Sequence, residues 1–127
     1  MLTWNDASDS DRLVDEEHHK LYRMMNRLEP AILAADKPEA LERAIGMLYQ
    51  RMAQHFDYEE ELAFGITPDE FAVLHKAHKA ILDLLARLRA LPVGDMDARR
   101  RMFGEFQAAL ARHDNEIDMP LFSKAMH

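Results

Sequence analysis

Apolar residues recur every three or four positions along four long stretches of the chain, which is the spacing of a helix that packs one face inward. In the first stretch this face carries Val14, Leu21, Met25, Leu28 and Ile32. The few glycines and prolines fall mostly between the stretches, at Pro38 and within residues 65–68 and 92–94. The pattern therefore predicts helices at about 11–35, 39–64, 69–91 and 97–119, preceded by an arm of residues 1–10.

Helices of this length with short turns between them favour one architecture. No segment alternates between apolar and polar residues with period two, so strands are not expected. The chain has 127 residues and 48% hydrophobic content, which is enough for a single core. We therefore expect an all-α fold, an antiparallel up-down-up-down four-helix bundle, formed by one domain that spans residues 1–127.

Histidine interrupts the apolar face of every predicted helix. The inward histidines are His18, His55, His78 and His113. Glu59 follows His55 by one helical turn on the same face, and no inward lysine or arginine is expected beside it. A single inward histidine is more often a hydrogen-bonded core residue than a metal ligand. Four of them beside a buried carboxylate favour a metal site, because the ion supplies the missing positive charge.

The positions of these residues along the helices place them at one end of the bundle. His18 and His78 come early in their helices, whereas His55 and His113 come late in theirs, and neighbouring helices run in opposite directions. Asp118 follows His113 by five residues, which is about 500° of helical rotation. The two side chains therefore approach the interior of the bundle from opposite flanks. This arrangement suits two metal ions side by side better than one tetrahedral ion.

Composition and charge narrow the chemistry further. The chain has no cysteine, which excludes disulfides, zinc–thiolate sites and iron–sulfur clusters. Histidine and carboxylate ligands suit iron, zinc, copper or nickel rather than calcium or magnesium. The formal charge of −7 opposes binding to nucleic acid, and the basic run from Arg99 to Arg101 is expected to form a solvated helix face. Because the start of the chain is polar and acidic and no long apolar run follows, we expect no membrane partner and a cytoplasmic location.

In this order and spacing the candidate residues resemble the hemerythrin family, in particular its single-domain bacterial form. The resemblance extends over nearly the whole chain: Trp4 in the arm, VDEEHHKLY at 14–22, HFDYEE at 55–60, HKAH at 75–78 and HDNEID at 113–118. It implies a non-heme centre of two iron ions, bridged by an oxo or hydroxo group from solvent, that binds dioxygen reversibly.

The family pattern implies a role for each candidate ligand. His18 and His55 would hold the iron that keeps an open position for dioxygen. Glu59 and Asp118 would bridge the two irons. Histidines of the third and fourth predicted helices would complete the other iron.

The third predicted helix departs from the family pattern at one position. The pattern asks for a histidine fifteen residues after Glu59, where this chain has Leu74, and a histidine follows at position 75. One interpretation is that a local change of the helical turn brings His75 onto the iron. His75 and His78 are three positions apart, and residues with this spacing share one face of a helix. In the other, Leu74 takes the place of the ligand, and that iron has an open or water-filled position. We favour the first, so the expected ligands are His18, His55, Glu59, His75, His78, His113 and Asp118.

The function that the resemblance implies is that of an oxygen-binding protein: a carrier, store or sensor whose partner is dioxygen. Two alternatives remain open, namely a di-iron enzyme that reduces peroxide or nitric oxide, and a domain that binds the metal for structure or iron storage. No inward acid or base beyond the proposed ligands supports catalysis, so we expect no enzymatic activity and no catalytic residues. A monomer is favoured.

Overall fold

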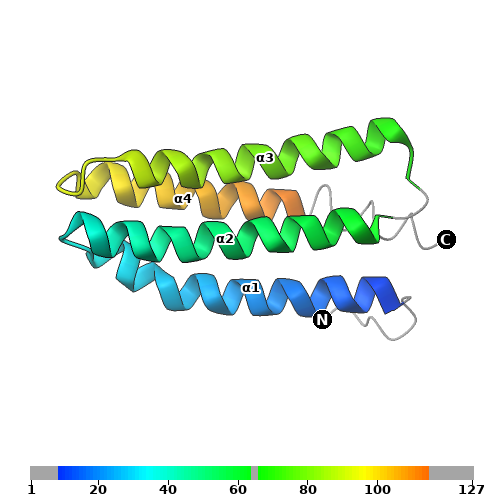
Figure 1. The fold of residues 1–127 in the computed structure, drawn as a ribbon, viewed down its shortest axis with the longest axis horizontal. Helices are drawn as coiled ribbons and strands as arrows, with labels where there is room; N and C mark the ends of the chain where they lie inside the picture. Colours follow the sequence, from blue (N-terminus) through cyan, green and yellow to red (C-terminus); the bar gives the residue numbers. More distant parts are fainter. Residues whose placement is uncertain (1–8, 64–65, 115–127) are drawn as a thin grey trace.

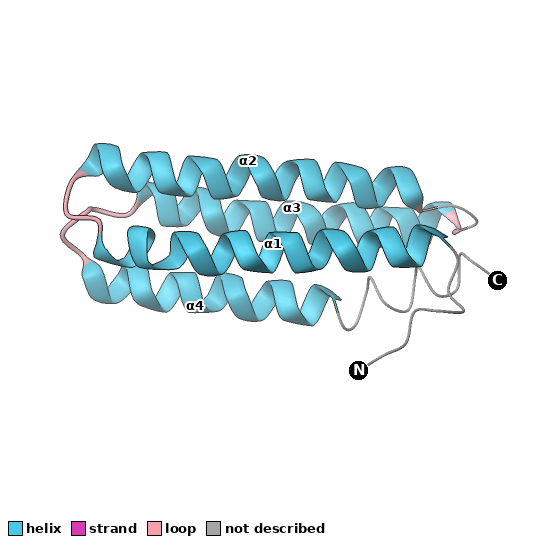
Figure 2. Cartoon of the chain, turned by 90° about the horizontal axis from the view of Figure 1, so that it is seen from below, coloured by secondary structure: helices cyan, strands magenta, loops and turns pink. Residues whose placement is uncertain are grey.

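Four helices make up most of the computed structural model, which describes residues 9–63 and 66–114. The helices are α1 (Asp9–Ala34), α2 (Pro38–Leu62), α3 (Pro68–Ala90) and α4 (Met96–His113). Each helix packs on the next in chain order, α4 also contacts α1, and the connections lie at alternating ends (Figure 1). In the described ranges Figure 2 shows only helices and loops, so the predicted all-α four-helix bundle is confirmed.

The helix boundaries lie within a few residues of the predicted ones, and capping residues fix the start of α3 and of α4. Thr67 precedes α3, where its hydroxyl accepts from the Glu70 N–H at 3.1 Å and its own N–H donates to the Glu70 carboxylate at 2.9 Å. Asp95 caps α4 by accepting from the Ala98 N–H at 3.1 Å. Most of the predicted arm and the predicted end of the fourth helix lie outside the described residues.

The inward face of each helix follows the predicted spacing. In α3 the buried residues are Leu74, His78, Ile81, Leu85 and Leu88. The opposite faces of the helices are exposed and mostly polar, with Met47, Phe71 and Val73 as exposed apolar residues. None of the described helices therefore combines the length and the apolar character that crossing a bilayer requires.

The interior of the bundle divides into two parts along its length. The end where α1 finishes and α2 begins is apolar, and its buried side chains belong to one continuous cluster that includes Ile32, Ile45, Leu48, Leu85, Leu88, Phe103 and Phe106. Toward the end where α1 begins, the buried side chains are increasingly polar. The buried polar side chains are His18, His55, Glu59, His78, His113 and Asp114, and apolar residues such as Phe56 and Leu74 lie among them.

Arg99 is a buried cation within the apolar part. Its side chain has no exposed surface, and its guanidinium donates to the backbone carbonyls of Ile32 (3.2 Å), Ala35 (2.6 Å) and Val93. Carbonyls at the end of a helix have no partner within the helix, and the helix dipole favours a cation there. The expectation of a solvated basic face is therefore wrong for Arg99, whereas the two arginines that follow it are exposed.

Replacing Arg99 by methionine should lower the free energy of unfolding by about 2–4 kcal/mol, because buried carbonyls lose their donor while the volume of the side chain is nearly kept. Arg101→Met, at an exposed position of the same helix, is the matched control and should change stability by less than about 0.5 kcal/mol. Urea unfolding followed by circular dichroism measures both. Similar midpoints for the two variants would contradict this role of Arg99.

Candidate metal centre

Four buried histidines, one from each helix, surround the carboxylate of Glu59. Glu59 itself has no exposed surface. The histidines are His18, His55, His78 and His113, and none is more than 8% exposed. The structure thus brings together five of the seven residues that the sequence predicts as ligands.

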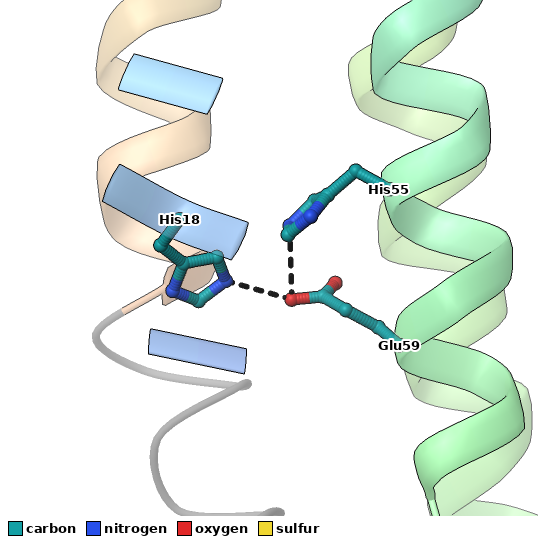
Figure 3. Close-up of side chains that lie close together, drawn as sticks. All are labelled: His18, His55 and Glu59. Atoms are coloured by element: carbon teal, nitrogen blue, oxygen red, sulfur yellow. Dashed lines mark hydrogen bonds and ion pairs between the residues drawn. The ribbon is translucent and has the colours of Figure 1, made fainter. Parts of the chain in front are cut away.

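The two oxygens of Glu59 face different pairs of histidines. On one side, Oε2 lies 2.8 Å from Nε2 of His18 and 3.2 Å from Nε2 of His55 (Figure 3). On the other side, Oε1 lies 2.9 Å from Nε2 of His78 and 3.6 Å from Nε2 of His113. The result is two groups of three potential ligands that share Glu59, and within each group the ligand atoms lie within 4.8 Å of one another.

The donor set and its surroundings fit metal ions. Neither ring nitrogen of His55 makes a hydrogen bond among the described residues, although its Nε2 lies 3.2 Å from Glu59. A buried nitrogen without a hydrogen bond and a buried carboxylate are both costly. A metal ion would use the lone pair of the nitrogen and balance the charge of the carboxylate.

A second carboxylate, Glu60, holds the far side of the His78 ring. Its Oε2 accepts from Nδ1 of His78 at 2.8 Å, and its Oε1 accepts from Nδ1 of His75 at 3.0 Å. Burial by itself would raise the pKa of the Glu60 carboxyl, but the hydrogen bonds from His78 and His75 lower the pKa below its ordinary value. Glu60 is therefore present as a carboxylate that accepts at both oxygens.

The histidines on the other side of the centre also have carboxylates nearby. Glu17 places its Oε1 3.9 Å from Nδ1 of His55 and accepts from Arg51 at 2.7 Å. Asp114 places its Oδ1 3.5 Å from Nε2 of His18, and its Oδ2 accepts a hydrogen bond from the Tyr22 hydroxyl.

Sequence reasoning missed these supporting carboxylates, although a signal exists. Each stands directly beside a predicted ligand in the sequence, as in the pairs Glu17–His18, Glu59–Glu60 and His113–Asp114. One residue is about 100° of rotation on a helix, so such a neighbour lies at the flank of the inward face, where it reaches a histidine of the adjacent helix.

His75 is not brought into either group of potential ligands. Its side chain is 64% exposed, whereas Leu74 has no exposed surface and lies one helical turn before His78. The prediction that His75 turns inward is therefore wrong, and Leu74 stands where the family pattern asks for a histidine. The helix is regular through this segment, so no change of turn moves position 75 to the inner face. Asp118, the remaining predicted ligand, lies outside the described residues.

Aromatic and aliphatic side chains enclose the two groups. The ring of Phe56 stacks on His78 with a centroid distance of 4.1 Å and an interplanar angle of 10°. It lies at 73° to the ring of His113, with a centroid distance of 5.7 Å. Met52 and Leu110 are also fully buried, one helical turn or less before His55 and His113. The polar centre therefore lies against an apolar wall rather than in bulk solvent.

A comparison with protein-family models agrees with this geometry. The model described as "Hemerythrin HHE cation binding domain" matches residues 9–125, a range that includes all four helices and both groups of potential ligands. Comparisons with curated proteins and with solved structures gave no match. The chain belongs to the hemerythrin HHE cation-binding domain family, and the histidine and glutamate clusters around Glu59 are its metal-binding clusters.

Proposed function

We propose that the chain holds two iron ions and binds dioxygen reversibly. The observation that carries this proposal is the position of Glu59, because each of its oxygens faces a separate pair of histidines. One carboxylate can then bind two ions at once, while each pair of imidazoles binds one of them. The nitrogen and oxygen donors suit iron, and the family resemblance favours iron over the other metals that accept such ligands.

Each group of residues has a separate task in this proposal. His18 and His55 would hold one ion, and His78 and His113 the other, with Asp118 as a second bridging carboxylate. The ferrous ions, when bound, supply the redox chemistry that dioxygen binding needs. The apolar wall that includes Met52 excludes bulk water, which would slow the loss of a bound charged ligand.

We further propose that the chain releases the dioxygen that it binds, as a carrier, store or sensor does, and that it is not an enzyme.

One observation supports a second candidate function, the reduction of peroxide or nitric oxide. Such reactions need a proton donor beside the metal. The Tyr22 hydroxyl donates to Asp114, whose other oxygen lies 3.5 Å from His18. This pair could deliver a proton on the side where the family pattern expects dioxygen.

Loading the metal-free protein with ferrous iron under argon should give two irons per chain. Air should then produce visible absorption that disappears when dioxygen is removed, over several cycles and without loss of iron. An iron content of one or less per chain, or bleaching that no removal of dioxygen reverses, would contradict the proposal. Repeated turnover of peroxide or nitric oxide by the wild type, but not by Tyr22→Phe, would instead establish the second candidate.

A further inference from the structure

We infer that Glu60 and His75 form a clamp that fixes the His78 ring for metal binding, so that His75 is a positioning residue and not a ligand. This inference rests on the metal centre proposed above. It gives a function to the histidine that the sequence led us to expect on the metal, and to a carboxylate that the ligand set does not include.

The His78 ring is held between consecutive carboxylates of α2. Its Nε2 lies 2.9 Å from Glu59 Oε1, and its Nδ1 donates to Glu60 Oε2 at 2.8 Å. Consecutive residues of a helix are about 100° apart, so the two carboxylates approach different edges of the ring. The hydrogen bond to Glu60 therefore directs the opposite nitrogen toward the metal centre.

The chemistry of a metal-bound imidazole explains why this direction matters. The ion takes the lone pair of one ring nitrogen, and the other nitrogen keeps its proton. A carboxylate that accepts the Nδ1 proton keeps it at that atom, which leaves Nε2 for the ion and makes it more basic. Phe56 restricts the ring plane, because it stacks on His78 at 4.1 Å with an interplanar angle of 10°.

His75 keeps the Glu60 carboxylate in place from the solvent side. A groove of about 400 Å³ between α2 and α3 is lined by Glu60, His75 and His78, so water has access to this carboxylate. The side chain of Glu60 is 17% exposed, and that of His75 is 64% exposed. The hydrogen bond from His75 Nδ1 to Glu60 Oε1, at 3.0 Å, occupies the oxygen that His78 does not use. Phe71 stacks beside the His75 ring at 6.3 Å, which supports its orientation.

Stepwise zinc titration with a competing chelator tests the clamp, because zinc accepts the same ligands and dioxygen plays no part. Glu60→Gln should weaken the binding of one of the two zinc ions by about 10- to 100-fold, as loss of a carboxylate behind a ligating histidine does. His75→Ala should weaken it by about 2- to 10-fold, as for one lost hydrogen bond. His75→Gln, whose amide can still donate to Glu60, should recover most of that loss. Lys76→Ala, at an exposed position beside His75, is the matched control and should change nothing.

Nuclear magnetic resonance of the zinc-loaded protein gives a readout that a general loss of stability would not produce. The Nδ1 proton of His78 should appear as a downfield, slowly exchanging signal in the wild type and in Lys76→Ala. It should move upfield or broaden in Glu60→Gln. His75→Ala should change it in the same direction but by less.

The possible outcomes separate the clamp from the metal centre on which it rests. A wild-type chain that binds no zinc and no iron would overturn the metal centre and the clamp together. If the wild type binds two zinc ions, and neither the affinities nor the His78 signal change in Glu60→Gln and His75→Ala, the clamp alone is overturned. A chain that shows the expected zinc results but binds no dioxygen would leave the clamp standing and refute only the proposed function.

Discussion

Replacing Glu59 by glutamine should reduce the iron content of the reconstituted protein from two ions per chain to at most one. The carboxylate is fully buried and offers one oxygen to each pair of histidines, whereas an amide has a single, neutral oxygen. The second ion should bind at least about 100-fold more weakly, which corresponds to about 2.8 kcal/mol. Metal analysis after anaerobic loading and desalting measures the ratio of iron to protein.

Glu61→Gln is the matched control for this experiment, because it changes the same residue type two positions further along α2 at an exposed site. It should retain two irons per chain. Two tightly bound irons in Glu59→Gln would show that the carboxylate does not bridge the ions, and the assignment of Glu59 would have to be abandoned.

Leu74→His should create a third imidazole on the side of the centre that His78 and His113 form. Leu74 is fully buried and lies one helical turn before His78, which is the position that the family pattern gives to a histidine. The ion on this side should bind about 10-fold or more tightly than in the wild type, since one added ligand contributes at least as much as a supporting residue. Without metal, the buried imidazole should lower the free energy of unfolding by about 1–3 kcal/mol.

The distinguishing result for Leu74→His is that added metal removes its loss of stability relative to the wild type. Metal stabilises the folded state of both proteins, but the additional imidazole should make the gain larger in the variant. Leu85→His, at a fully buried position of α3 three helical turns away, is the matched control. Its loss of stability relative to the wild type should be the same with and without metal. Thermal unfolding of both variants with and without zinc measures the difference. If metal rescues neither variant, position 74 does not face the ion.

Periodicity was sufficient to predict the helices and the inward histidines of this chain. The apolar stripe of α3 places both Leu74 and His78 inside, and both are buried. His18 comes early in α1 and His55 comes late in α2, and these neighbouring helices run antiparallel. The two histidines therefore lie at the same height along the bundle. These features depend only on the rise and rotation of the helix, which the sequence specifies locally.

Three features were not predicted correctly. For His75 the family motif was followed against the phase of its own helix, whereas Arg99 and Glu60 depend on what the neighbouring helices offer. His75 was expected inside on the strength of a motif, but the regular phase of α3 leaves it at the surface. Arg99 belongs to a run of charges that resembles a solvated face, yet its long side chain reaches the free carbonyls at the end of α1. Glu60 lies at the flank of its helix, where only the position of α3 decides that it meets two histidines. The spacing of residues in the sequence predicts which face of its helix a residue occupies, but not which residue of another helix it contacts.

The division of the interior into an apolar part and a polar part has a consequence for how an ion reaches its ligands. Near Arg99 the helices are joined by continuous apolar packing and by hydrogen bonds that need no metal. At the other end, the charge of Glu59 and the nitrogens of four histidines lie among the apolar side chains and interrupt this packing. Local opening should therefore cost least at the metal-binding end while the metal is absent. Such opening would let an ion reach the buried ligands, and the bound ion would then make the same opening more costly.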